Sequence, residues 1–400
     1  MARILYAWEL GAGMGHIEKV WKILAELRRR GHEVIAVARD HELAERRFGP
    51  LGIVVRPAPK FFMKVIPTPA TYAGMLAVQG WTQPAALVAA SMHWKAIVDE
   101  IRPDLALVDH GPTVLLVLRG SGVPTAVLGS GWAIPPLSSP LPRLTMNGVA
   151  SEKEVAATAV LERGIVRCVN SVTKSIGVPP LEVVADLFAG ATPFLLTFPE
   201  LDHYGRRRPE PTYWGPQMLL NRGRGPTWSG TGRRVAGYLK TSVPGALALV
   251  EAIRQRSDID GLLYLAGADP ATCAALSSPT LTVVHEPLDL DAVLGDAEVL
   301  ISHAGMGTVS AGVLHGCAQL VVPAHLEQHV IGVLLSRLGV GGAVTAPDSD
   351  PGRSTIDAVI GDTSMPVAAS VLADRHAGFD QAVAAAAITD ECEALIGRSH

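Results

Sequence analysis

The chain of 400 residues is poor in several features that mark particular protein classes. Its four cysteines, at positions 168, 273, 317 and 392, are far apart and form no CxxC pair, so they indicate neither a zinc site nor a disulfide framework. No apolar run approaches the roughly 18 residues of a membrane span, and the first residues do not have the pattern of a signal peptide. We therefore expect a cytoplasmic protein with reduced thiols and no membrane span.

Charged residues are also few, at 18% of the chain, with a formal net charge of −4 and a pI near 6.4. This balance offers no electrostatic footprint for nucleic acid or for an anionic membrane. Apolar residues make up 48% of the sequence, enough for a well-filled core. Because 400 residues exceed what one hydrophobic core usually serves, we expect two domains.

The most informative stretch runs from Glu298 to Val340. It opens with an apolar segment, Val299 to Ile301, and passes through the turn His303-Ala304-Gly305-Met306-Gly307-Thr308 into a helical pattern that ends near Gly316. Glycines let the backbone approach a ligand closely, and the first amides of a helix lie unpaired at the positive end of its dipole. A loop of this kind favours a diphosphate.

A second apolar strand, Gln319 to Val322, stops at Pro323 and is followed by His325, Glu327 and Gln328. The carboxyl ends of parallel strands lie at one edge of a sheet, which is where open α/β sheets bind ligands. Polar groups there, beside an anion loop on the neighbouring strand, predict a nucleotide-sugar pocket.

The first half of the chain begins with a strand, Arg3 to Ala7, followed by the turn Gly11-Ala12-Gly13-Met14-Gly15-His16. An amphipathic helix comes next, and Glu33 to Ala38 is a second strand. A competing interpretation is a dinucleotide-binding fold, since glycines at 11 and 13 begin G-x-G-x-x-G and Asp40 is placed to hold a ribose. It fails at the third glycine, which is His16.

A third strand, Leu105 to Val108, leads into Asp109 and His110. Taken alone, Asp109 is equally an N-cap for a helix from Pro112, and His16 is equally a helix N-terminal residue that packs on its own turn. Residues 56–95 are irregular and rich in Pro, Met and aromatic side chains, which suits core packing or an apolar acceptor pocket.

These motifs resemble family 1 glycosyltransferases, which move a sugar from UDP- or TDP-sugars to small acceptors. The family's H-x-G-x-G-T/S turn matches the segment from His303 to Thr308, its small-Gly-x-P strand matches Gly316 to Pro323, and its acidic-Gln pair matches Glu327-Gln328. In the first half, Gly15-His16 and Arg30 to Val34 match the family's opening turn and its Arg-Gly-His-Glu-Val motif.

The resemblance implies an α/β protein of the GT-B fold, with two Rossmann-like doubly wound domains facing across a cleft. Residues 1–214 would form an acceptor-binding domain, 215–232 a linker and 233–378 a nucleotide-sugar-binding domain. Residues 379–400 would contain a helix that returns to the first domain. We expect no metal and no cofactor other than the UDP- or TDP-sugar donor. The partners expected are that donor and a small-molecule acceptor, and the oligomeric state stays open.

The resemblance also assigns roles to residues. His16 would be the base that deprotonates the acceptor, Asp109 would hold its other ring proton, and His110 would be a spare base. The sugar would then transfer with inversion. The substrate-binding residues expected are Gly13, Gly15, Lys240, His285, His303, Gly305, Met306, Gly307, Thr308, Glu327 and Gln328.

Four positions depart from the family pattern. Ala311 stands where a ribose-binding Glu is common, Glu327 stands where Asp is usual, and His285 replaces a base-stacking Trp. Lys19 occupies the place of a Pro three residues after the proposed base. Two alternatives of the same fold therefore stay open, a nucleotide-sugar 2-epimerase and a non-catalytic nucleotide-sugar-binding protein.

Overall fold

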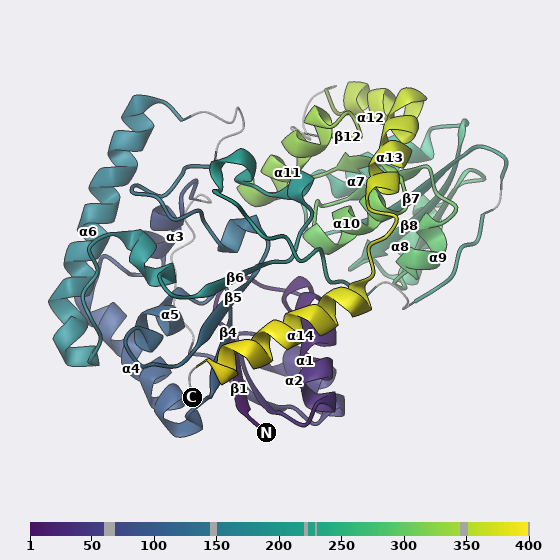
Figure 1. The fold of residues 1–400 in the computed structure, drawn as a ribbon. Coiled ribbons are helices and arrows are strands. Elements are labelled where there is room, and N and C mark those ends of the chain that lie inside the picture. Colours follow the sequence, from purple (N-terminus) through teal and green to yellow (C-terminus); the bar gives the residue numbers. More distant parts are fainter. Residues whose placement is uncertain (60–68, 145–149, 220–222, 229, 345–350, 399–400) are drawn as a thin grey trace. The chain divides into compact units, whose positions relative to one another are not determined.

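The chain forms two compact units in the computed structural model, which describes all residues except 60–68, 145–149, 220–222, 229, 345–350 and 399–400 (Figure 1). The first unit comprises Met1–Gln217 together with Asp380–His400, and the second comprises Met218–Phe379. Each is built on its own parallel sheet with helices on both faces, and the two are described separately.

The sheet of the first unit has six parallel strands in the order β3-β2-β1-β4-β5-β6. The strands are β1 (Arg3–Trp8), β2 (Glu33–Ala38), β3 (Val54–Pro57), β4 (Leu105–Asp109), β5 (Thr125–Gly129) and β6 (Thr192–Leu195). Its helices are α1 (Gly15–Arg29), α2 (His41–Phe48), α3 (Tyr72–Val78), α4 (Pro84–Ile101), α5 (Pro112–Leu118), α6 (Glu152–Ile176) and α14 (Gln381–Gly397). Both faces of β1 and β4 are covered, which explains their continuous apolar runs.

The chain changes direction across this sheet between β1 and β4, which are neighbours although β2 and β3 separate them in sequence. The parallel register pairs Trp8 with Asp109 at the carboxyl ends of the two strands. This is the topological switch point where ligands bind in doubly wound sheets. The predicted site residue Asp109 therefore lies at the edge of the sheet where a ligand is expected.

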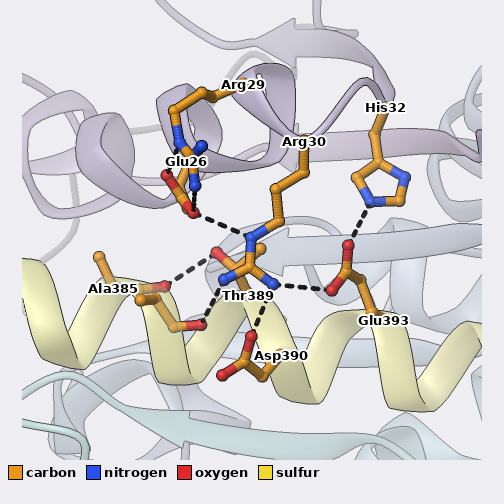
Figure 2. Close-up of polar contacts among 9 residues, drawn as sticks. Glu26, Arg29, Arg30, His32, Ala385, Thr389, Asp390 and Glu393 are labelled. Atoms are coloured by element: carbon orange, nitrogen blue, oxygen red, sulfur yellow. Dashed lines mark hydrogen bonds and ion pairs between the residues drawn. The ribbon is translucent and has the colours of Figure 1, made fainter.

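Helix α14, shown in yellow in Figure 1, packs beside α1 in the first unit. Its apolar side contributes Ala385, Ile388 and Cys392 to the core cluster that also holds the buried face of α1. Polar contacts surround this packing (Figure 2). Arg30 pairs with Asp390 at 2.6 Å and with Glu393 at 2.7 Å, and His32 Nε2 lies 2.9 Å from Glu393 Oε1. Arg30 and His32 of the Arg-Gly-His-Glu-Val motif thus anchor α14.

The second unit repeats the architecture, with six parallel strands in the order β12-β11-β10-β7-β8-β9. The strands are β7 (Arg233–Lys240), β8 (Ile259–Ala266), β9 (Leu281–Val284), β10 (Val299–Ser302), β11 (Ala318–Val321) and β12 (Gly341–Ala343). The helices are α7 (Ala246–Arg254), α8 (Pro270–Leu276), α9 (Leu290–Leu294), α10 (Met306–Leu314), α11 (Leu326–Arg337), α12 (Pro351–Gly361) and α13 (Ser364–Arg375). Its switch point lies between β10 and β7.

The segment 215–232, expected as a linker, packs in part against the second unit. Met218 is buried in a core cluster of that unit. The amide of Arg224 donates to the carbonyl of Pro287 at 2.8 Å, and a Cβ at Gly223 would lie only 2.3 Å from the same carbonyl oxygen. Glycine at 223 therefore permits a close backbone approach, so this part of the segment is ordered structure rather than a loose connection.

Among the described residues, no single helix has both the length and the apolar character to cross a membrane. One pair of helical segments, Thr355–Gly361 and Ser364–Arg375, satisfies those criteria together, with a bend of 65° between them. All four cysteines are buried, and none forms a disulfide.

Candidate active site

The glycine turn between β1 and α1 places His16 in the first turn of α1, with its imidazole at the switch point. Gly11 has φ +87°, and a Cβ there would lie 2.1 Å from His16 Nε2 and 2.7 Å from Cε1. Only glycine combines this backbone conformation with this closeness to the ring. Gly11 was not among the predicted site residues, because its role depends on where the His16 ring lies.

Two neighbouring side chains fix the orientation of the His16 ring. Nδ1 lies 2.9 Å from Asp109 Oδ2, and the ring stacks on the Trp8 indole with centroids 4.8 Å apart and planes 15° apart. Trp8 is itself held, since its Nε1 donates to the carbonyl of Leu10 at 2.8 Å. The structure therefore brings together the two residues predicted as a dyad.

Asp109 is fully buried, yet its carboxylate is surrounded by partners. The Tyr6 hydroxyl oxygen lies 2.9 Å from Asp109 Oδ2 and 2.9 Å from the carbonyl oxygen of His16, so its one proton is donated to either acceptor. Lys19 Nζ donates to the other carboxylate oxygen, Oδ1, at 2.6 Å. Burial opposes ionisation, but Lys19 and His16 outweigh it and hold the pKa of Asp109 well below its usual range.

The partners of His16 determine which nitrogen is the base. Since Asp109 is ionised and only accepts, the Nδ1 proton of a neutral imidazole is donated to it. Nε2 is then the nitrogen with a free lone pair, on the side that Gly11 leaves uncovered. Burial and the Lys19 ammonium lower the pKa of His16 and outweigh Asp109, which acts in the opposite direction. The resting site therefore holds a neutral, oriented imidazole, as a general base requires.

Two further titratable groups lie beside this pair. His110, with φ +45°, is buried and directs Nε2 toward Met75 Sδ at 2.8 Å, and burial lowers its pKa to about 3. Glu9 was not anticipated from the sequence. It is 1% exposed, and its Oε2 accepts from the amide of Thr113 at 2.9 Å. Burial raises the pKa of Glu9 to about 7, against the hydrogen bonds from Thr113 and Val114.

Open space and aromatic side chains also occur in this part of the unit. A Cβ at Gly13 or Gly15 would meet no atom within 4 Å. A small cavity is lined by Thr71, Tyr72, Met75, Trp132, Leu144 and Tyr204. It includes part of the Met- and aromatic-rich stretch proposed for the acceptor, although residues 60–68 of that stretch lie outside the described residues.

In the second unit, His303 ties three strand ends together. It follows β10, its Nδ1 donates to the carbonyl of Val322 after β11 at 2.9 Å, and its Nε2 accepts from the amide of Lys240 at the end of β7 at 2.8 Å. Burial lowers the pKa of His303, which favours this neutral form. Because both ring nitrogens have backbone partners, the imidazole in this arrangement positions the loop rather than presenting a donor to a ligand.

The loop after His303 leads directly into α10. Ala304 adopts φ +56°, an unfavourable backbone for a residue with a Cβ, and its amide donates to Ser302 Oγ at 3.2 Å. Gly305 is the N-cap of α10 and offers no side-chain cap to the helix amides. A Cβ at Gly305 would meet nothing nearer than 4.0 Å. The helix start, with Met306, Gly307 and Thr308, is thus approachable by an anion.

The remaining predicted donor-site residues lie at or after the carboxyl ends of strands of this sheet. Lys240 ends β7 and is exposed, with Nζ 5.8 Å from the centroid of the Tyr238 ring. Glu327 and Gln328 lie in the first turn of α11, where Gln328 Oε1 accepts from the amide of Ala324 at 2.7 Å. His285 is exposed after β9, the edge strand, so it is the predicted residue farthest along the sheet from β10.

Ala311, which replaces a carboxylate in the resembling family, is fully buried in a cluster of apolar side chains. It offers no hydrogen-bonding group to a ribose. Among the described residues, no group of three or more His, Cys, Asp or Glu side chains is arranged to hold a metal ion.

Comparison with known proteins places this geometry in context. No protein-family model matches the chain. The elloramycin glycosyltransferase ElmGT of Streptomyces olivaceus is 28% identical over 137 residues, and the match spans 34% of this chain and 34% of that protein. The chain thus aligns with only about a third of that relative's length.

Solved structures match over nearly the whole chain. The glycotransferase of kitacinnamycin aligns with a TM-score of 0.71 and 17% identity, covering 99% of both chains. The glycosyltransferase VinC in complex with DTDP aligns with a TM-score of 0.67 and 17% identity, covering 99% of this chain and 100% of that one. These matches confirm the predicted GT-B fold and the predicted resemblance to glycosyltransferases.

Proposed function

We propose that this chain, which has the GT-B fold, is a glycosyltransferase that moves a sugar from a TDP- or UDP-sugar to a hydroxyl group of a small-molecule acceptor. The observation that carries the proposal is the His16–Asp109 pair, an oriented neutral imidazole on a buried carboxylate at the switch point of the first unit. The names of the similar proteins support the reaction class. The first unit would bind the acceptor and the second the nucleotide sugar.

The chemistry that we infer for the first unit is general-base catalysis. Nε2 of His16 removes the proton from the acceptor hydroxyl as its oxygen attacks the anomeric carbon of the sugar. The bond from that carbon to the diphosphate breaks on the opposite face, so the configuration inverts. Asp109 holds the Nδ1 proton and stabilises the imidazolium that forms. The proton ends on His16 and the electron pair on the diphosphate.

The second unit would stabilise the departing diphosphate. The N-terminus of α10, at Met306, Gly307 and Thr308, has the amides and the dipole direction that favour an anion. Lys240 would neutralise phosphate charge. His303 contributes by holding these strand ends in place.

Glu327 and Gln328 would bind the sugar hydroxyls, and exposed His285 would stack on the pyrimidine. Ala311 provides no partner for a ribose hydroxyl, and VinC was crystallised with DTDP. We therefore infer a TDP-sugar as the preferred donor, with a UDP-sugar as the second choice.

The acceptor is expected to be apolar or aromatic. A Cβ at Gly13 or Gly15 would meet nothing within 4 Å, and Tyr72, Trp132 and Tyr204 line a cavity of about 10 Å³ in the same unit, which would have to widen to admit an aromatic acceptor. A screen of phenolic and aminocyclitol alcohols with TDP- and UDP-sugars would identify a working acceptor.

The decisive experiment then compares His16→Ala with the wild type and with His93→Ala, which removes an exposed imidazole on α4. We expect His16→Ala to lower kcat by about 10² to 10⁴, the usual worth of general-base catalysis, with nearly unchanged affinity for the nucleotide. Asp109→Asn should lose less, because the imidazole remains. His93→Ala should behave like the wild type.

Several outcomes would contradict the proposal. Full activity of His16→Ala would show that another group is the base. Release of the nucleoside diphosphate without any acceptor would favour a nucleotide-sugar 2-epimerase. Tight nucleotide binding with no turnover of any acceptor would indicate a binding protein.

A further inference from the structure

Lys19 is a charged side chain beside the His16–Asp109 dyad that neither the sequence motifs nor the proposed mechanism uses. It projects from α1 one turn after His16, and its side chain is only 19% exposed. Its Nζ lies 2.6 Å from Asp109 Oδ1 and 3.3 Å from His16 Nδ1. Because Nδ1 donates its proton to Asp109, the second distance is a close approach between a cation and a ring N–H, which disfavours a positive charge on the ring.

We propose that Lys19 is a positioning residue that keeps His16 neutral by donating from its ammonium group to the second oxygen of Asp109. This rests on the proposed function, for which His16 is the base. In a simple His–Asp pair, a buried carboxylate is compensated only when the histidine is protonated, so the pair draws a proton onto the ring. Here the ammonium already compensates Asp109. The carboxylate orients the imidazole, and Lys19 offsets the increase in proton affinity that the carboxylate causes.

The net charge of Lys19, Asp109 and His16 shows how Lys19 changes the protonation of the base. With Lys19 protonated, Asp109 ionised and His16 neutral, the three groups carry no net charge at rest. Without Lys19, the resting pair would carry one negative charge, and protonation of His16 would neutralise it. The lysine therefore extends the range over which the base is ready to accept a proton toward lower pH. In exchange, it stabilises the imidazolium less.

Other groups around His16 do not replace this effect. Arg39, which follows β2, adds a weaker positive influence on the ring. Tyr6 on β1 is protonated, because burial holds its pKa well above the usual value. His110, after β4, is neutral because burial lowers its pKa to about 3. The ionised groups that oppose each other at His16 are therefore Lys19 and Asp109.

The test measures the pKa of His16 directly, by two-dimensional NMR of histidine labelled with ¹⁵N, with the signals of His16 identified by their loss in His16→Gln. In the wild type we expect a pKa below the ordinary value of about 6.5, despite the carboxylate at hydrogen-bond distance. Lys19→Gln keeps a hydrogen-bond donor for Asp109 but removes the charge, and should raise the pKa of His16. Lys19→Arg keeps the charge and should leave it close to the wild-type value.

A matched control is available on the same helix. Lys22 Nζ donates to Gln381 Oε1 at 2.9 Å, and Lys22 is not among the main charges that act on His16 or Asp109. Lys22→Gln removes the same charge and should leave the pKa of His16 unchanged. An unchanged or lowered pKa in folded Lys19→Gln would overturn the proposal. If that variant fails to fold, a wild-type pKa above about 6.5 would overturn it equally.

Turnover provides a second readout. The acidic limb of the kcat/KM profile should move to higher pH in Lys19→Gln and stay in place in Lys22→Gln. A purely structural role for Lys19 would lower kcat/KM at every pH without moving the limb, and would contradict the proposal. The NMR titration needs no substrate, so it tests the role of Lys19 even if the chain proves to have another activity.

Discussion

Gly11→Ala is expected to displace the ring of the proposed base, His16, although it leaves the imidazole itself unchanged. The backbone at Gly11 has φ +87°, and the added methyl carbon would lie 2.1 Å from His16 Nε2. Ordinary contact begins at 3.4 Å, so the ring or the turn has to move by 3.4 − 2.1 = 1.3 Å. The His16 ring is confined by Trp8 on one face and by Asp109 at Nδ1. Any such movement therefore disturbs the arrangement that defines the base.

The substitution has two effects of different size, the backbone strain of a Cβ at positive φ and the steric clash with the His16 ring. A residue with a Cβ in the left-handed region costs about 1–2 kcal/mol, and a misplacement of about 1 Å in an active site costs on the order of 10²-fold in rate. Gly13 supplies the matched control. Its φ is +90°, but a Cβ there would meet nothing within 4 Å. Both variants should lose the stability that a Cβ at positive φ costs, Gly11→Ala should lose more because of its clash, and only Gly11→Ala should displace the His16 ring.

The assay combines thermal unfolding with NMR of the His16 ring in both variants, followed by turnover once an acceptor is known. We expect a larger loss of stability in Gly11→Ala than in Gly13→Ala, a changed His16 signal only in Gly11→Ala, and a turnover of that variant reduced by about 10²-fold. If the two variants left identical His16 spectra, the close approach of Gly11 to the base would be refuted.

Three further changes test other parts of the structure. His303→Ala removes the ring partners of two backbone groups and should lower the free energy of unfolding by about 2–4 kcal/mol in chemical denaturation. It should also weaken nucleotide binding, measured by calorimetry. His285→Ala removes an exposed ring and should change the free energy of unfolding by less than about 0.5 kcal/mol. In the folded protein the pKa of Glu9 is about 7 against an ordinary 4.5, so its contribution to stability is present below pH 4.5 and is lost as the pH rises through 7. In urea denaturation, Glu9→Gln should therefore match the wild type in acid and exceed it by roughly 3 kcal/mol above pH 7. Parallel curves of unfolding free energy against pH for the two proteins would contradict this. In chemical denaturation, Ile388→Ala should lower the free energy of unfolding by about 2–5 kcal/mol and Glu393→Gln by less than about 1 kcal/mol. The reason is that burial of the apolar face of α14 contributes more to stability than its half-exposed ion pairs do. Equal losses in the two variants would contradict this.

The parts of the fold that the sequence predicts well are those encoded locally. The strand at 33–38 is found at the predicted residues, because its apolar run after a glycine turn leaves little choice of element. The neighbouring positions of His16 and Asp109 follow from a general rule, since both leave the carboxyl ends of strands that pair beside a switch point.

Other features depend on contacts that no local pattern contains. Lys19 appeared in the sequence only as a departure from a familiar motif, and its meaning comes from an oxygen of Asp109, 90 residues away. His303 has the motif of a ligand-binding residue, but its ring nitrogens are occupied by Lys240 and Val322. Glu9 follows an apolar strand with no sign that it is buried. In each case, the packing of neighbouring strand ends decides the chemistry.

The placement of α14 also has a consequence for how the protein is made. The ribosome completes the first 217 residues of the first unit well before it synthesises Asp380–His400, the segment that covers their core. At about 5–20 residues per second, the roughly 180 residues in between and beyond take on the order of 10 to 40 s. During that time, the apolar side of α1 that packs in one core cluster with Ile388 and Cys392 is exposed to water and to chaperones. The second unit, whose sequence is continuous, can fold first, although it begins later.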